Sequence, residues 1–330
     1  MVKVVFEGSP YELKEGESLL DGLLAHGVDV PHGCRTGTCQ SCLLKCSEGF
    51  IPEAAQKGLR ATQKLNRSLL ACQCVPEGEI HVTASASEGL KLMARIEGLR
   101  ILNPEILEVT LKPEHPIEYR AGQFIRLYNP DGVARSYSLA SVPGIDRALI
   151  LHIRAYPGGS VSQWVHQDLR IGDMVSISEA LGECMYVPGR PEQPLLLIGT
   201  GTGLAPLYGI LRDALQNGHH AALHLYHGAR TEQGPYLTDE LKAIAAQHPN
   251  FQYHACVSET GTVTNSTLLQ GRASDLALAH HPDLKGWSVF LCGNPEMVRS
   301  TQMQAFIAGT HLDDIHADPF DSQAQKPSET

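Results

Sequence analysis

The chain has 330 residues, of which 42% are hydrophobic and 19% charged, a composition ordinary for a globular protein and too apolar for a disordered one. It carries 26 Lys and Arg against 36 Asp and Glu, so its net charge of −10 argues against nucleic acid as a partner. The most apolar stretch, residues 195–211, is interrupted by glycines and a proline, so we expect no membrane span. The N-terminal residues alternate like a strand and have no signal-peptide core, which predicts a cytoplasmic protein.

The first 90 residues predict a small domain with a cysteine-rich loop. A strand is expected over residues 2–6, followed by a helix that begins after Ser18, has leucines at helical spacing and ends near Gly27. Six of the nine cysteines follow, and a strand is expected around residues 79–82. The small, polar stretch 84–89 is predicted to be a linker.

Two further domains are expected downstream. Short strands separated by Gly, Pro and Asn predict an antiparallel barrel or sandwich; they are expected at residues 95–102, 107–111, 124–128, 136–140, 149–154 and 174–177. Beyond residue 191, strands alternate with helices, which predicts a parallel sheet with right-handed crossovers. The histidine pairs 219–220 and 280–281 are expected at the surface near helix ends.

Four cysteines have the spacing of a plant-type [2Fe–2S] site. Cys34, Cys39 and Cys42 follow a Cys-x4-Cys-x2-Cys pattern, and Cys72 follows after 29 intervening residues. Two irons bridged by two sulfides need four thiolates, which a wrapping loop and one distant segment can supply. Gly37, between the first two ligands, would let the backbone approach an inorganic sulfide.

Other interpretations of these cysteines are weaker. A zinc site could use Cys39, Cys42, Cys72 and Cys74, but it lacks the second Cys-x2-Cys turn and leaves the first cysteine unused. Buried free thiols are common singly but not as six within 41 residues. A Rieske centre needs Cys-x-His pairs, and the sequence has none. We therefore predict the [2Fe–2S] cluster, with Cys46 and Cys74 as ordinary thiols.

The loop 34–42 and the segment 70–73 resemble the ferredoxin domain fused to NAD(P)H-dependent flavoprotein reductases. The resemblance implies a β-grasp ferredoxin domain over residues 1–86, in which the four spaced cysteines bind the cluster. Gln40 departs from the family pattern, which usually has a small residue after the second ligand. This departure affects hydrogen bonding near the cluster and leaves the ligand count intact.

Residues 135–138, Arg-Ser-Tyr-Ser, resemble the Arg-x-Tyr-Ser motif of the ferredoxin–NADP reductase superfamily. The resemblance implies that the Arg135 guanidinium binds the flavin phosphate through two oxygens. It also implies that Tyr137 packs on the isoalloxazine and that Ser138 hydrogen-bonds near N5, the atom that accepts hydride. Alone, such a motif is just a polar strand, and its position after a ferredoxin segment is what favours the flavin interpretation.

The turn 157–162 resembles the same superfamily's Gly-x-x-Ser turn, at which the start of a helix binds the flavin pyrophosphate. The residues implied there are Gly159, Val161 and Ser162. Further candidates for flavin contacts, on the preceding strand, are His152 and Arg154. Domain order implies FAD rather than FMN, in an antiparallel β-barrel domain over residues 93–189.

Residues 195–206 read as strand, Gly-rich loop and helix start, and they resemble the nicotinamide-domain loop of the superfamily. The loop is not the Gly-x-Gly-x-x-Gly fingerprint, because Leu204 occupies the third glycine position, and an ordinary αβ turn has the same pattern. The resemblance implies that the loop binds the dinucleotide pyrophosphate through Gly199, Thr200, Gly201, Thr202, Gly203 and Pro206.

Residues 290–297 contain Cys-Gly-Asn-Pro, which resembles the Cys-Gly-x-Pro motif that the superfamily places at the nicotinamide. Cys292 would then position C4 for transfer, with Gly293, Pro295 and Met297 beside it, although a buried cysteine at a strand end is the commoner fate. The implied catalytic residues are thus Ser138 and Cys292. A doubly wound nicotinamide-binding domain is expected over residues 191–322, before a polar tail at 323–330.

Two residues bear on the cofactors less directly. Phe320 ends a segment similar to the C-terminal strand of oxygenase reductases, and it is expected either to cover the flavin or simply to pack. Arg230 follows the second strand of the nicotinamide domain and would lie near the dinucleotide. Glu259, after the third strand, would repel a 2′-phosphate, which favours NADH over NADPH.

The resemblance covers nearly the whole chain and implies the reductase component of an aromatic-ring dioxygenase or related monooxygenase system. Electrons would pass from NADH through FAD to the [2Fe–2S] cluster, and then to a Rieske ferredoxin or an oxygenase. Two alternatives stay open: a CDP-deoxysugar-type reductase with the same relay, and a cluster sensor that does not turn over.

Overall fold

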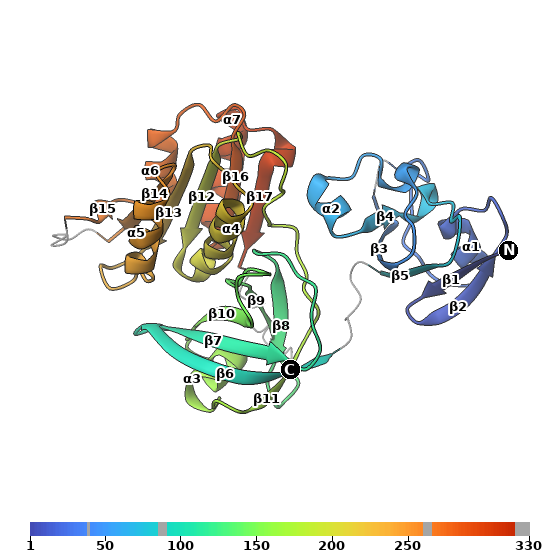
Figure 1. Cartoon of the computed structure of the whole chain (residues 1–330), viewed down its shortest axis with the longest axis horizontal. Coiled ribbons are helices and arrows are strands. Elements are labelled where there is room, and N and C mark those ends of the chain that lie inside the picture. The colour runs from blue at the N-terminus through green and yellow to red at the C-terminus, as the bar shows by residue number, and fades with distance from the viewer. Residues whose placement is uncertain (38–39, 85–90, 260–265, 321–330) are drawn as a thin grey trace, which may run out of the picture. The chain divides into compact units, whose positions relative to one another are not determined.

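The computed structural model describes residues 1–37, 40–84, 91–259 and 266–320. The chain divides into two units, Met1–Gly89 and Leu90–Thr330 (Figure 1). Cys39, most of the predicted linker 84–89 and the predicted tail 323–330 lie outside the described residues. No helix in the described part is both long enough and apolar enough to cross a membrane.

The first unit is built on a five-stranded sheet of order β2-β1-β5-β3-β4. β1 pairs antiparallel with β2 and parallel with β5, and α1 packs its leucines on this sheet, which confirms the β-grasp prediction. Its elements are β1 (Val2–Phe6), β2 (Ser9–Leu13), α1 (Leu19–Ala25), β3 (Leu43–Glu48), η1 (Glu53–Gln56), α2 (Ala61–Leu65), β4 (Ser68–Leu70), η2 (Ala71–Gln73) and β5 (Ile80–Ala84).

Helix α1 begins and ends where the sequence predicts. The Ser18 hydroxyl accepts the N–H of Asp21 at 3.1 Å, which satisfies one of the donors that the first turn leaves unpaired. At the other end, Gly27 has φ +79° and donates its N–H to the carbonyl of Leu24 at 2.9 Å.

The second unit starts with the predicted antiparallel barrel. The strand order is β10-β7-β6-β11-β8-β9, and an antiparallel bridge between Leu139 and Leu151 joins the two ends of the sheet. Its elements are β6 (Leu92–Asn103), β7 (Ile106–Pro113), β8 (Phe124–Tyr128), β9 (Ala134–Ser138), β10 (Leu149–Arg154), α3 (Ser160–Gln167) and β11 (Met174–Ile177).

A parallel sheet follows, with order β15-β14-β13-β12-β16-β17. Every pair in it is parallel, as predicted. Its elements are β12 (Leu195–Thr200), η3 (Gly201–Gly203), α4 (Leu204–Gln216), β13 (Leu223–Ala229), α5 (Thr238–Gln247), β14 (Phe251–Val257), β15 (Leu269–Gln270), α6 (Ala273–His280), β16 (Ser288–Gly293), α7 (Pro295–Ile307), η4 (Leu312–Asp314) and β17 (Ile315–Pro319).

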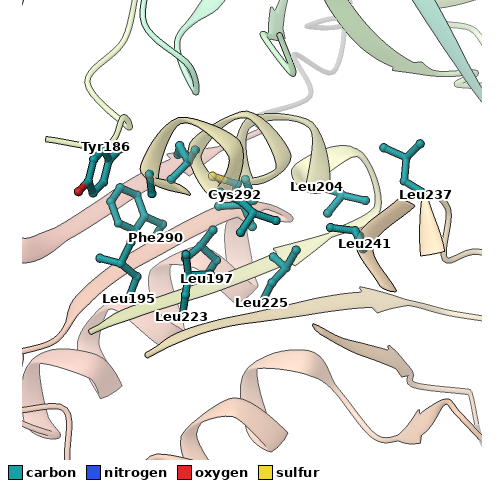
Figure 2. Packing of buried hydrophobic residues seen from close by; sticks show 14 of the residues in the cluster. Tyr186, Leu195, Leu197, Leu204, Leu223, Leu225, Leu237, Leu241, Phe290 and Cys292 are labelled. Carbon is teal, nitrogen blue, oxygen red and sulfur yellow. The ribbon is translucent and has the colours of Figure 1, made fainter. Parts of the chain in front are cut away.

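The parallel sheet is buried on both faces, which makes the domain doubly wound. Along β12, Leu195 and Leu197 pack with side chains of α4 and α5, and Figure 2 shows this cluster. The alternate residues Leu196 and Ile198 pack on the opposite face with α6 and α7. Successive side chains of a strand point to opposite faces of the sheet. Because both faces are buried here, each residue from Leu195 to Ile198 is apolar, which explains the continuous apolar run in the sequence.

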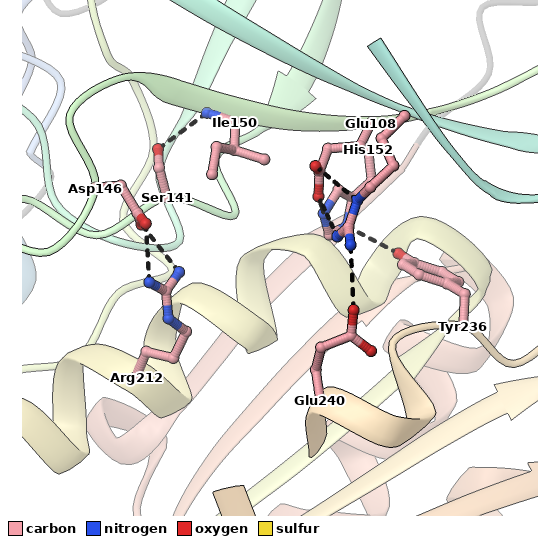
Figure 3. A network of polar contacts seen from close by, with 9 residues as sticks. Glu108, Ser141, Asp146, Ile150, His152, Arg212, Tyr236 and Glu240 are labelled. Carbon is pink, nitrogen blue, oxygen red and sulfur yellow. Dashed lines mark hydrogen bonds and ion pairs between the residues drawn. The ribbon is translucent and has the colours of Figure 1, made fainter. Parts of the chain in front are cut away.

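The barrel and the parallel sheet belong to one unit because they share a core and ion pairs. Ile106 of the barrel lies in the apolar cluster that contains α4 and α5. Gly209 of α4 approaches the barrel so closely that a Cβ there would lie 3.2 Å from the carbonyl oxygen of Ala140. Arg212 of α4 donates twice to Asp146 of the barrel, at 2.9 Å each (Figure 3).

Candidate functional site

The cysteine loop of the first unit places sulfurs beside hydrogen-bond donors. The backbone N–H of Thr36 donates to Cys34 Sγ at 3.4 Å, and Gln73 Nε2 lies 3.6 Å from Cys72 Sγ. Gln73 also donates to the carbonyl of Arg35 at 3.0 Å, so it ties the segment that follows Cys34 to the segment of Cys72. Such donors stabilise thiolate sulfur, and they fit an iron–sulfur cluster.

Cys42 and Cys72 also interact directly. Burial raises the pKa of the Cys42 thiol, and the neighbouring Cys72 side chain raises it further. Two thiolates held this close repel each other unless a cation lies between them, so this pair fits a metal cluster. Cys39 lies outside the described residues, and among the described residues no group of three His, Cys, Asp or Glu side chains is arranged around a single metal ion.

The loop is tightly wound around this position. Gly37 has φ +83°, and a Cβ there would lie 3.2 Å from Cγ of Gln73, so a larger residue would be strained as well as crowded. Gln40, the departure from the family pattern, has φ +55° and donates to the carbonyl of Gly58 at 3.2 Å. Gln63 donates in turn to Gln40 Oε1 at 3.4 Å. Gln40 therefore braces the loop against the segment around α2.

Two other cysteines of this unit lie in its apolar core. Cys46 and Cys74 are 1% and 0% exposed. Burial, and the charge of Cys46 nearby, raise the pKa of Cys74 to about 12, so it stays a neutral thiol. Both positions suit the prediction that these residues are ordinary thiols.

The second unit brings two Gly-rich loops together at the carboxyl ends of β12 and β16. A Cβ on Gly203 would lie 2.2 Å from the carbonyl oxygen of Cys292, and one on Gly293 would lie 2.6 Å from that of Thr200. The N–H of Asn294 donates to the Thr200 hydroxyl at 3.0 Å. The strand order reverses direction between β12 and β16, and this is where open α/β sheets bind their ligands.

A polar group from the barrel meets this edge of the sheet. The Ser138 hydroxyl donates to Asp318 Oδ2 at 3.0 Å, and Asp318 is the register partner of Cys292. Burial raises the pKa of Asp318 to about 6. Burial, together with Cys184 at 3.6 Å between the two sulfurs and the charge of Asp318, raises the pKa of Cys292 well above its usual range.

The structure thus brings together the two residues implied as catalytic and adds two that the sequence analysis missed. Ser138 lies at the end of β9 and Cys292 near the end of β16, 154 residues apart in sequence, and Asp318 connects them. Cys184 stands in no motif. Asp318 stands in the segment ending at Phe320 that resembles the C-terminal strand of oxygenase reductases, but that resemblance implied no role for it. Phe320, two residues further, donates its N–H to the carbonyl of Gly293 at 2.8 Å and so lies at the same edge.

The predicted flavin residues lie on β9 and around the start of α3. Arg135 and Tyr137 share one face of β9; burial raises the pKa of Tyr137, and Arg135 counteracts this. Gly159 occupies the N-cap position of α3, and a Cβ there would lie 2.4 Å from the Ser162 hydroxyl. Val161 is 1% exposed within the barrel core, so only its backbone could face a ligand.

His152 and Arg154, on the same face of β10, point toward the parallel-sheet domain. His152 Nδ1 lies 3.1 Å from the Tyr236 hydroxyl of that domain. The Arg154 guanidinium lies 3.9 Å from the position of a Cβ on Gly201, and it pairs with Glu105 at 2.6 Å.

The remaining predicted nucleotide residues lie around the two loops. Pro206 is buried in the first turn of α4, and Thr202 is part of η3. Pro295 opens α7, and the N–H of Met297 donates to the Asn294 side chain at 3.1 Å. Arg230 follows β13, and its carbonyl accepts the N–H of Glu259 at 2.9 Å.

Comparison with known domain families matches each part of the chain. Residues 4–77 match the 2Fe-2S iron-sulfur cluster binding domain, residues 102–186 the oxidoreductase FAD-binding domain and residues 197–303 the oxidoreductase NAD-binding domain. The chain is 31% identical to the ferredoxin–NAD(P)+ reductase component of the naphthalene 1,2-dioxygenase/salicylate 5-hydroxylase systems of Ralstonia sp., over 92% of this chain and 94% of that protein. The chain belongs to the ferredoxin–NAD(P)+ reductase family.

This reductase is therefore an oxidoreductase with domains for a [2Fe–2S] cluster, FAD and NAD. It is also 33% identical to the reductase subunit of aromatic O-demethylase from Amycolatopsis sp., over 89% of this chain and 90% of that one. The crystal structure of the Amycolatopsis cytochrome P450 reductase GcoB superposes with a TM-score of 0.68 at 30% identity, covering 97% of this chain and 99% of that one.

Proposed function

We propose that this reductase takes electrons from NADH and delivers them to a Rieske-type ferredoxin, or directly to the terminal oxygenase, of an aromatic-ring hydroxylating system. When bound, FAD accepts a hydride from NADH and passes single electrons to the [2Fe–2S] cluster. The observation that carries the proposal is that one chain has a ferredoxin-type cysteine loop and, in its second unit, the Ser138–Asp318–Cys292 group. The similar reductase components of naphthalene, terephthalate and phenol oxygenase systems support this class of acceptor.

The domain limits that we assign are 1–86 for the ferredoxin domain, 93–189 for the FAD domain and 191–322 for the nicotinamide domain, with a polar tail at 323–330. These limits place each predicted motif inside a single domain. The proposed cluster ligands are Cys34, Cys39, Cys42 and Cys72.

For the flavin, we assign the phosphate to Arg135 and to the turn that contains Gly159, Val161 and Ser162. Backbone N–H groups at the start of α3 suit a pyrophosphate. Tyr137 would pack on the isoalloxazine. Arg154, expected at the flavin from the sequence, lies beside Gly201 of the predicted dinucleotide loop, and we assign its charge to the dinucleotide pyrophosphate.

At the hydride-transfer position, the side chains orient the reactants. Asp318, with a pKa of about 6, is mostly ionised at neutral pH and fixes the Ser138 hydroxyl by accepting its hydrogen. Cys292 remains a neutral thiol because of burial, so it acts by packing rather than as a nucleophile. We assign Phe320, whose N–H donates to the carbonyl of Gly293, to packing over the flavin.

We assign NADH as the donor. The backbone contact between Glu259 and Arg230 places the ends of β14 and β13 side by side, so the Glu259 carboxylate belongs to the environment of the adenosine ribose. A carboxylate there repels a 2′-phosphate. We also propose a cytoplasmic location, as expected from the sequence.

Anaerobic stopped-flow mixing of the holoprotein with each nucleotide tests the proposal. We expect flavin bleaching to be at least about 10-fold faster with NADH than with NADPH, followed by bleaching of the cluster. Flavin bleaching without any reduction of the cluster would contradict the relay, and faster reduction by NADPH would contradict the donor. Steady-state turnover with a purified Rieske ferredoxin tests the acceptor class, and the absence of its reduction would overturn that part.

A further inference from the structure

Three polar contacts connect the flavin barrel to the segment between β13 and α5 and to the first turn of α5. Asn103 Nδ2 donates to the carbonyl of Gly234 at 2.8 Å. Arg100 Nη1 donates to Glu240 Oε1 at 3.2 Å, and His152 Nδ1 meets the Tyr236 hydroxyl at 3.1 Å. Figure 3 shows His152, Tyr236 and Glu240 on the two sides of this contact. The segment thus takes its position from both domains.

Tyr236 is the buried centre of the contact. Its ring is 2% exposed and stands edge-on to two imidazoles, with centroids 5.3 Å from His152 and 5.2 Å from His227. His227 Nε2 donates to the carbonyl of Gly201 at 3.1 Å, within the predicted dinucleotide loop. Side chains therefore connect β10 of the barrel to the Gly201 loop through Tyr236.

A carboxylate lies beside the His152 ring. Glu108 Oε2 is 3.7 Å from His152 Nε2, which is beyond hydrogen-bond distance, and its negative charge favours the proton of the neutral ring on Nε2, so that Nδ1 accepts from the Tyr236 hydroxyl. Arg100 donates to both oxygens of Glu108, at 3.0 and 2.9 Å. Burial opposes ionisation of Glu108, but the neighbouring His152 and the hydrogen bonds from Arg100 outweigh it and lower the pKa of Glu108 to about 2.

The segment needs such support because its backbone is strained. Leu237, which precedes α5, has φ +54°, a conformation that costs a non-glycine residue free energy. It is held there by burial at 7% exposure among side chains of α4 and α5. In parallel sheets, the loop after the strand next to the phosphate loop carries the adenosine end of a dinucleotide.

We propose that Glu108, His152 and Tyr236 are positioning residues that hold segment 230–237 in its NADH-binding conformation. The flavin domain thereby sets the affinity of the neighbouring domain for the dinucleotide. This inference rests on the proposed function, because it assumes that NADH binds at the carboxyl ends of β12 and β13.

Tyr236→Phe tests the inference, because it removes only the hydroxyl and leaves the ring. We expect the Kd of NAD+ for the oxidised holoprotein, measured by difference absorbance, to rise about 5-fold, the equivalent of about 1 kcal/mol for one buried hydrogen bond. KM for NADH should rise in parallel, while kcat at saturating NADH stays within about 2-fold of the wild-type value. The flavin absorption spectrum should be that of the wild type. Asn103→Ala, which removes a second contact to the segment, should raise the Kd in the same direction.

Tyr186→Phe is the matched control. The Tyr186 hydroxyl lies 3.4 Å from His219 Nδ1, and the two rings are also edge-on, but this pair is beside the amino ends of the parallel strands. It should leave the Kd of NAD+ unchanged. An unchanged Kd in both Tyr236→Phe and Asn103→Ala, or an equal rise in Tyr186→Phe, would overturn the inference. Failure of the wild type to bind NAD+ would instead overturn the proposed function.

Discussion

Acid should destabilise the nicotinamide domain through a cluster of imidazoles. His224 Nδ1 of β13 lies 3.5 Å from His254 Nε2 of β14, and the ring centroid of His281 lies 4.4 Å from that of His224. Burial, followed by repulsion from neighbouring histidines, lowers the pKa of both His224 and His254 to about 4. We predict that lowering the pH from 7.5 to 5.5 weakens the fold of this unit.

The sign and size follow from proton linkage. An imidazole in the unfolded chain has a pKa of about 6.5, so below that pH the ring binds a proton in the unfolded state. In the folded state the same ring stays neutral until the pH falls to about 4. Stability is therefore complete above pH 6.5 and falls as the pH decreases toward 4. Between pH 7.5 and 5.5 each ring contributes a loss of about 1.3 kcal/mol, and for these two partly exposed rings we expect about 1–3 kcal/mol together.

Thermal unfolding of the holoprotein measures this effect. For a unit of this size, about 1–3 kcal/mol corresponds to a fall in Tm of about 3–10 °C between the two pH values. His254→Gln removes one ring and also removes its charge repulsion on His224. The fall in Tm of this variant between the two pH values should therefore be about half that of the wild type or less. His115→Gln, at an exposed turn, serves as the control. Equal falls in Tm for wild type and His254→Gln would refute the reasoning.

Four further variants test the cofactor sites. Cys72→Ser should abolish the cluster absorption while NADH still bleaches the flavin. Cys74→Ser, in the apolar core, should keep the cluster absorption. The reverse pattern would make Cys74, not Cys72, the fourth cluster ligand. Gly203→Ala puts a methyl group 2.2 Å from the carbonyl oxygen of Cys292, so titration should show at least about a 10-fold rise in the Kd of NAD+, and an unchanged value would contradict the loop assignment. Asp318→Asn should slow hydride transfer about 10- to 100-fold in stopped flow, and the wild-type rate should fall as the pH drops below about 6; a pH-independent rate would contradict the role of the carboxylate.

Local signals in the sequence were enough to predict much of the fold. Ser18 and Gly27 bound helix α1 through contacts with residues only three positions away, which a sequence pattern can show. The alternation between the two faces of β12 likewise follows from one apolar run. By contrast, β2, β3 and β4 carry mixed or short patterns, and their pairing partners decide their structure.

The part of the site that the sequence could not show depends on contacts between distant segments. Asp318 meets Ser138 across 180 positions, and no local pattern marks an aspartate that closes such a contact. The histidine pairs show the same limit. His220 and His280 are exposed as predicted. The prediction was wrong for His219, which is 4% exposed and packs against Tyr186, and for His281, which is half-buried against His224 and Trp287.

The proposed function depends most on the electron path from nucleotide to cluster. Anaerobic titration of the holoprotein with NADH, followed together by flavin absorbance and by electron paramagnetic resonance of the cluster, tests it directly. We predict that the signal of a reduced [2Fe–2S] cluster appears as the flavin bleaches in wild type and is absent from Cys72→Ser. A wild-type protein whose flavin bleaches fully with no cluster signal, or one that contains zinc in place of iron, would contradict the account.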